Sequence, residues 1–309
     1  MAWWFSVNSL DVWTVAMILV AAGVYLSALV ATGAVLFRLA FPRLPDHDRR
    51  RVARMGVFAA WAGVILILFQ WPLEAGYLGG GNISAATNPM LLGIVFEGAS
   101  GGRLMLAVAG LLLVQAIQLN NLALSKTANS VSLVGVLLVM LAFVQVGHTV
   151  NTPRLVLAGL LIVHLMAAAF WVASLWPLFH LVGRGHNQDN TAHILTRFGK
   201  IAMGGVGLLV LAGVTLATLL TGGLTPLLTT AYGQLLIGKV LIVAALLLFA
   251  AANKWRLVPA FESGDATAPG RLQRSIALEM VLVVVILLIT AVLTRVTSPN
   301  GGLTGQPPC

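Results

Sequence analysis

Ionisable side chains are scarce in the long apolar segments of this sequence, and the few that occur there are the first candidates for chemistry. They are His148, His164, Lys239 and Glu279. A titratable group is expensive to place in a lipid bilayer, so its presence there marks a functional site by default. His148 ends one apolar segment, and His164 lies roughly 13 Å into the next at 1.5 Å per helical residue. Because the connection between the two segments is short, we expect both imidazoles to face one cavity that opens to the outside.

This histidine pair predicts a metal site, and two methionines on the same segments could complete it. Met140 precedes His148, and Met166 follows His164. Imidazole is a ligand for copper in either oxidation state, and thioethers favour Cu(I). Alternatively, the two histidines could ligate one haem b iron from opposite sides. The third interpretation is that each histidine lies in the core, bonded to a neighbouring helix.

Two other polar groups lie in or near the same apolar segments. Trp171 follows His164 by two helical turns and so shares its face, where it either flanks the metal site or packs in the core. Lys239 is expected to extend its ammonium outward to the membrane surface. Its alternative partner is an acid near the outer surface, such as Glu97.

A polar cluster is predicted at the inner ends of the last two apolar segments. Glu279 lies about five residues into the last segment, and its expected partners are Asn253 or Lys254 at the end of the segment before it. Such a cluster is either structural or part of an exit gate or proton relay.

The composition requires a membrane protein around these groups. Of 309 residues, 59% are hydrophobic and 9% are charged, and the mean hydropathy is +0.96. A soluble domain carries roughly 25% charged residues, and a disordered chain needs low hydrophobicity. Both classes are therefore excluded. Continuous apolar runs of about 20 residues predict membrane-spanning helices rather than the alternating strands of a barrel. We expect eight spans, at 13–37, 55–72, 103–122, 131–148, 155–181, 198–220, 233–252 and 275–294.

The basic residues predict how these spans are oriented. Fourteen of the eighteen lysines and arginines fall in alternate connections, whereas Arg103, Arg154 and Arg295 fall on the other side. Basic loops stay in the cytoplasm. Both termini are therefore expected outside the inner membrane, in the periplasm. The long 72–102 connection would also lie outside, either as an inert connector or as a segment against the membrane.

Two pairs of segments suggest an internal duplication. RMGVFAAWAGVILIL (54–68) aligns with RFGKIAMGGVGLLVL (197–211), and GASGGRLMLAV (98–108) is similar to TAYGQLLIGKVLIV (230–243). An even number of spans in each half would give a parallel repeat. We therefore expect two four-helix halves, residues 1–150 and 151–309.

The second half resembles the copper-resistance D (CopD) family. The resemblance lies in HLMAAAFWVASLWPL (164–178), TRFGKIAMGGVGLLVLAG (196–213), TTAYGQLLIGKVLIV (229–243), AANKWRLVP (251–259) and LQRSIALEMVLVVVILLITAVL (272–293). It implies a multi-pass inner-membrane protein that takes up copper or confers tolerance to it. It also implies a periplasmic copper-binding partner of the CopC type.

Three functions follow from these observations, ranked by how much of the sequence each explains. The first is a copper permease that passes the ion from His148 to His164. The second is a membrane scaffold for a periplasmic copper protein, and the third is a redox protein with one haem. No nucleotide-binding or zinc-hydrolase motif occurs in the sequence. We therefore expect no enzyme, and the basic charge calls for no nucleic-acid partner because it lies in topogenic loops.

Overall fold

The fold was analysed on a computed structural model, which describes residues 11–116, 126–145, 154–184, 188–221 and 224–295. Within these ranges the chain is helical and contains no strand. The helices are α1 (Val12–Ala40), α2 (Asp46–Leu78), α3 (Ile83–Ala86), α4 (Pro89–Glu97), α5 (Ala99–Leu113), α7 (Lys126–Val144), α8 (Arg154–Arg184), α9 (Gln188–Thr221), α10 (Leu224–Thr229), α11 (Ala231–Ala252), the π-helix η3 (Asn253–Leu257), α12 (Val258–Glu262) and α13 (Ala268–Arg295).

The predicted all-helical membrane fold is confirmed. Seven helices are long and apolar enough to cross a bilayer, and an eighth span exists if α4 and α5, which meet at a 75° bend, count as one. The expected span 103–122 runs beyond residue 116 into a stretch outside the described residues, so its inner end is not compared here. The predicted parallel repeat and the outward position of both termini stay predictions.

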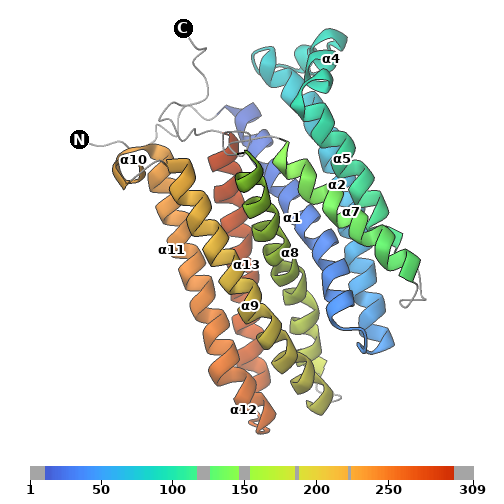
Figure 1. Ribbon diagram of the computed structural model, residues 1–309, viewed down its shortest axis with the longest axis vertical. Coiled ribbons are helices and arrows are strands. Elements are labelled where there is room, and N and C mark those ends of the chain that lie inside the picture. The colour runs from blue at the N-terminus through green and yellow to red at the C-terminus, as the bar shows by residue number, and fades with distance from the viewer. Residues whose placement is uncertain (1–10, 117–125, 146–153, 185–187, 222–223, 296–309) are drawn as a thin grey trace.

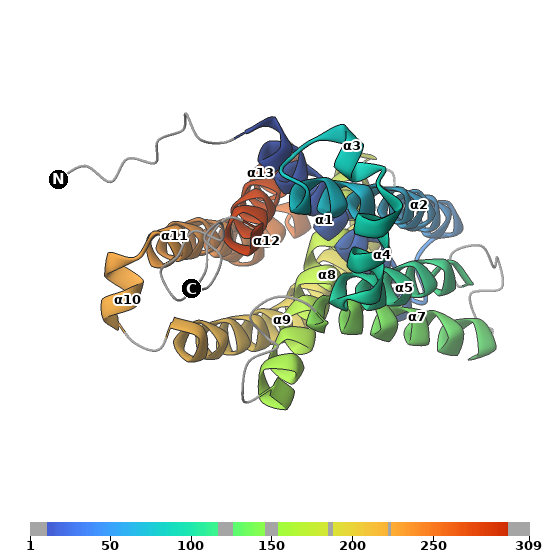
Figure 2. The same ribbon diagram turned by 90° about the horizontal axis from the view of Figure 1, so that it is seen from above.

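The long helices form two groups that share α1 (Figure 1). α2, α5 and α7 lie on one side, and α8, α9, α11 and α13 lie on the other. Figure 2 shows α1 between α2 and α8, and it packs against both of them and against α13. One apolar core fills the first group and a second fills the other. The first helix therefore joins the two halves of the sequence.

A glycine allows α1 to approach α8 closely. A side chain at Gly33 would place its Cβ 1.9 Å from the backbone oxygen of Ala169, which is closer than any real contact. Small residues let helix backbones touch in membranes, where packing rather than the hydrophobic effect holds helices together. Gly33 is thus required where the two halves meet.

The expected 72–102 loop is wrong, because most of it is helical. α2 does not end at Pro72 but continues to Leu78, and α3 and α4 follow within the next twenty residues. α4 packs back on α2, where the indole of Trp71 donates to the backbone oxygen of Leu92 at 3.0 Å. The segment therefore caps the outer end of α2 and α5, and the extra turns of α2 carry Glu74 toward the neighbouring helices.

Candidate functional site

A buried carboxylate lies between the helices of the second group. Glu279 of α13 is 3% exposed and accepts two hydrogen bonds. Trp171 of α8 donates its indole N–H to Oε2 at 3.3 Å, and Asn253 donates its amide N–H to Oε1 at 2.5 Å. Both donors are neutral, and Glu279 forms no ion pair with any residue that the structure describes. The site therefore holds an acid whose charge, if present, has no basic counterpart.

A π-helix positions the amide. Asn253 begins η3, in which the N–H of Val258 donates to the carbonyl of Asn253, five residues earlier. One wide turn of this kind rotates the following side chains and often occurs at functional sites. The Asn253 side chain is buried, and its Oδ1 has no hydrogen-bond partner among the described residues. The amide thus uses its donor on Glu279 and leaves its acceptor unused.

A cavity of about 320 Å³ adjoins this cluster. α8, α9, α11 and α13 supply most of its wall, which is largely apolar. Its polar lining consists of Glu279, Asn253, Lys254, Trp171 and Trp255, together with the thioether of Met203. Lys254 points its Nζ to within 3.0 Å of the Met203 sulfur rather than toward the carboxylate.

These contacts confirm one predicted pair and redirect another residue. Glu279 does meet Asn253, as the sequence predicts, whereas Lys254 bonds to the Met203 sulfur instead. Trp171 shares the C-terminal core with apolar neighbours, and its polar atom is used on Glu279 rather than on a metal site.

His164 lies on the α8 face that meets α9. Its Nδ1 is 3.2 Å from the backbone oxygen of Leu209. A carbonyl can only accept, so Nδ1 carries the proton and Nε2 of the neutral imidazole keeps its lone pair. Gly213 leaves room for the ring, since an added Cβ would lie 3.4 Å from Cε1 of His164. Nε2 has no hydrogen bond within the described part of the chain and is available as a ligand.

A lysine lies within electrostatic reach of this imidazole. The charge of Lys239 in α11 acts on His164, and among the residues described Lys239 forms neither a hydrogen bond nor an ion pair. It does not pair with Glu97, which is exposed at the outer end. Two basic groups therefore share the outer half of the second helix group.

The structure does not bring the other predicted copper ligands to His164. Met140 is 1% exposed and lies in the core formed with α1, α2 and α5. Met166 is 36% exposed, and it lies only two helical positions from His164, which turns it to a different side of α8. His148 lies outside the described residues. Across the ranges that are described, no three His, Cys, Asp or Glu side chains are grouped as metal ligands.

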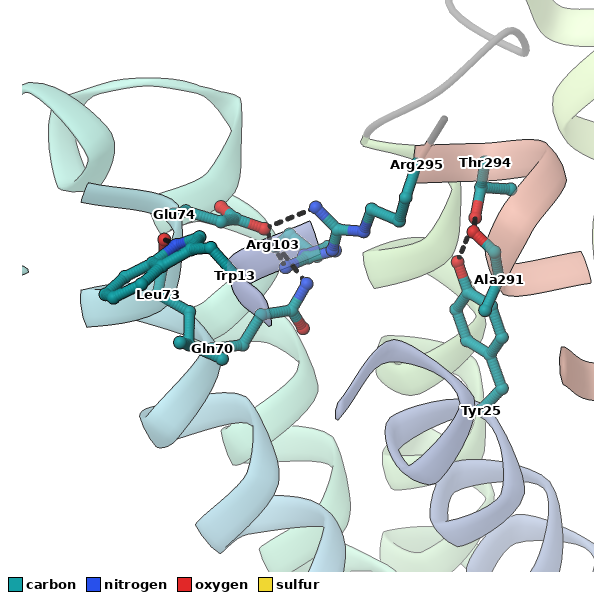
Figure 3. A network of polar contacts seen from close by, with 9 residues as sticks. All are labelled: Trp13, Tyr25, Gln70, Leu73, Glu74, Arg103, Ala291, Thr294 and Arg295. Atoms are coloured by element: carbon teal, nitrogen blue, oxygen red, sulfur yellow. Dashed lines mark hydrogen bonds and ion pairs between the residues drawn. The ribbon is translucent and has the colours of Figure 1, made fainter. Parts of the chain in front are cut away.

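A second polar cluster joins the outer ends of three helices (Figure 3). Glu74 of α2 accepts on one oxygen, Oε1, from Gln70 at 2.9 Å, Arg103 at 3.1 Å and Arg295 at 2.8 Å. The three charged side chains are 12–16% exposed. Arg103 is on α5 and Arg295 ends α13, so the carboxylate ties the first helix group to the last helix.

Sequence reasoning missed this outer cluster, although a signal for it exists. Gln70 and Glu74 are spaced i,i+4 and share one helix face. Ending the span at Pro72 hid that spacing. Arg103 and Arg295 are two of the three basic residues placed on the outer side by the charge pattern, and they reach the same acid.

Two family profiles match the chain. Copper resistance protein D matches residues 192–293, and the N-terminal domain of copper resistance protein D-like proteins matches residues 9–153. The second range covers α1 to α7. The first covers most of α9 and continues to the end of α13, and so includes Asn253 and Glu279.

One curated relative is similar over part of its length. The inner membrane protein YebZ of Escherichia coli (strain K12) is 35% identical over 113 residues. That alignment spans 35% of this chain and 38% of the relative. No solved structure matches the chain.

Proposed function

Because the chain belongs to the copper-resistance D family and is a multi-pass inner-membrane protein, we propose that it moves copper ions across that membrane. A periplasmic copper-binding protein of the CopC type delivers the ion to the outer face. The proposal adds a transport step to the copper relation that the family carries. It also assigns the outer face to the periplasm, which is supported by the fourteen basic residues of the opposite connections.

The observation that carries the proposal is the orientation of His164. Its Nδ1–H is fixed by the Leu209 carbonyl at 3.2 Å, and Nε2 is left as a ligand inside a membrane helix. Metal-binding histidines commonly have their second nitrogen bonded to a carbonyl or carboxylate, because this fixes the tautomer and the ring. His164 is therefore prepared for a metal, with any further ligand supplied by the partner, by water or by His148.

Lys239 determines which copper ion suits this position. Its positive charge repels a cation at His164, and that repulsion is twice as large for Cu(II) as for Cu(I) at the same distance. A monovalent ion is consequently favoured. The repulsion also weakens binding, which helps a transported ion to leave, because conduction needs sites that release what they bind.

The copper content of cells tests this function. His164→Ala removes the ligand, and His180→Ala is a matched control because His180 is on the same helix and also bonds a backbone carbonyl, that of Trp176 at 2.9 Å. We expect cells producing the wild-type protein or His180→Ala to change their copper content relative to cells without the protein. His164→Ala should lose at least most of that change. Equal copper content in both variants, at equal protein levels in the membrane, would reject the proposal.

A further inference from the structure

Glu279 is an acid without a counterion, and this sets it apart from the acid of the outer cluster. Glu74 is held by two arginines, whereas Glu279 receives only an indole N–H and an amide N–H. A buried charge that lacks an opposite charge is costly and is relieved most simply by taking up a proton. The environment therefore suits a carboxyl group that changes its protonation state.

The groups facing Glu279 leave it without an ion pair from any side. Among the cavity-lining residues from α8, α9, α11, η3, α12 and α13, Lys254 is the one other ionisable group, and its Nζ lies against the Met203 sulfur. α1 packs on α13 from the other side, and its buried cation near the inner end is Arg38. Neither basic group forms an ion pair with Glu279 in the described part of the molecule.

Asn253 can satisfy both protonation states of Glu279. In the structure its amide N–H donates to the carboxylate, while Oδ1 is buried without a partner. Rotation of the amide by half a turn would present Oδ1 instead, which can accept the O–H of a protonated Glu279. One side chain thus serves the charged form as a donor and the neutral form as an acceptor, with no movement of the backbone.

A second unused polar atom lies one turn toward the inner end of α13. Ser275 is four residues before Glu279, is buried, and its Oγ has no hydrogen-bond partner among the described residues. Residues spaced i,i+4 share a helix face. A hydroxyl both donates and accepts, so Ser275 is suited to pass a proton between Glu279 and the inner side.

We propose that Glu279 is a proton-binding residue that couples copper movement to the transfer of protons. One proton binds a carboxylate oxygen of Glu279 and forms an O–H bond to it, and its departure restores the carboxylate. Asn253 positions the carboxyl group in both states. The coupling rests on the proposed function, but the proton binding at Glu279 does not, so the two can fail separately.

Infrared spectroscopy of the purified full-length protein, without copper, tests the proton binding. A protonated carboxylic acid has a carbonyl stretching band that disappears when the acid ionises. We expect one such band to be lost as the pH is raised and to be missing in Glu279→Gln. The matched control Glu97→Gln, at an exposed acid, should keep it. Asn253→Ala should shift the band, because the acid then loses its partner. A spectrum without a Glu279-dependent band at any pH would overturn the inference.

Proton and copper fluxes in proteoliposomes then test the coupling. In wild-type vesicles, added copper should produce a pH change in the lumen, and Glu279→Gln should abolish it. The substitution keeps the size of the side chain and an oxygen that can accept from Trp171 and Asn253, so the fold should persist and can be checked by circular dichroism. Copper uptake with no pH change in the wild type would refute the coupling while leaving the proposed function intact. Absence of copper uptake would refute the proposed function instead.

Discussion

The outer cluster should contribute strongly to stability, and Glu74→Gln tests it. The substitution keeps the shape of the side chain but removes the charge that two arginines share. Arg103 and Arg295 are then left close together with exposures of 15% and 16% and no acid between them. Removing one partner from a buried ion pair costs about 3–5 kcal/mol. Because the cluster is at the outer ends of the helices, we expect a value near the lower limit, about 3 kcal/mol.

This loss is large relative to a typical folding free energy of about 5–15 kcal/mol. It can be measured by reversible unfolding in mixed micelles of increasing SDS content, followed by tryptophan fluorescence. Trp13 is a local probe because its indole N–H donates to the Leu73 carbonyl at 2.8 Å, beside the cluster (Figure 3). Glu97→Gln is the control, since Glu97 is exposed at the same end of the molecule.

A double-mutant cycle separates the ion pair from other effects. Glu74→Gln and Arg295→Gln, alone and together, give the coupling energy between α2 and α13. We expect favourable coupling within the usual range of about 0.5–3 kcal/mol for contacting residues. Coupling indistinguishable from zero, or equal unfolding of Glu74→Gln and the control, would show that the shared carboxylate does not hold these helices together.

Two further predictions concern packing and metal preference. Gly33→Ala should destabilise the protein by about 1–3 kcal/mol, because its Cβ would meet the Ala169 oxygen, whereas Gly204→Ala, with no atom within 4 Å of the new Cβ, should not; equal unfolding midpoints for the two variants would contradict this. Lys239→Met should tighten copper binding at His164 and should do so more for Cu(II) than for Cu(I), because it removes a positive charge. Competition titration with chelators measures both affinities, and unchanged or weaker binding would contradict the role given to Lys239.

The sequence predicts the helices well because their cause is local. Apolar runs long enough to cross a bilayer are visible in the residues themselves, and each expected span within the described residues has a helix. The ends of the spans are less well predicted. Pro72 suggests a stop, yet α2 continues to Leu78 because contacts with α1, α3 and α4 hold its last turns.

The sites depend on helix rotation, which the sequence does not contain. Met140 and His164 lie on expected neighbours, but Met140 faces the first core and His164 faces α9. The meeting of Glu279 with Asn253 was predictable from their depth alone. The π-helix that turns Asn253 toward it has no signal in the residue pattern, because it arises from how α11 packs on α13.

Copper uptake by purified protein in proteoliposomes tests the central claim most directly. Vesicles that contain a copper chelator should accumulate the metal from added Cu(I) when they carry the wild-type protein or His180→Ala. Protein-free vesicles and those with His164→Ala should accumulate little. Accumulation by the wild-type protein no faster than by protein-free vesicles would contradict the account and favour a membrane scaffold that moves no ion.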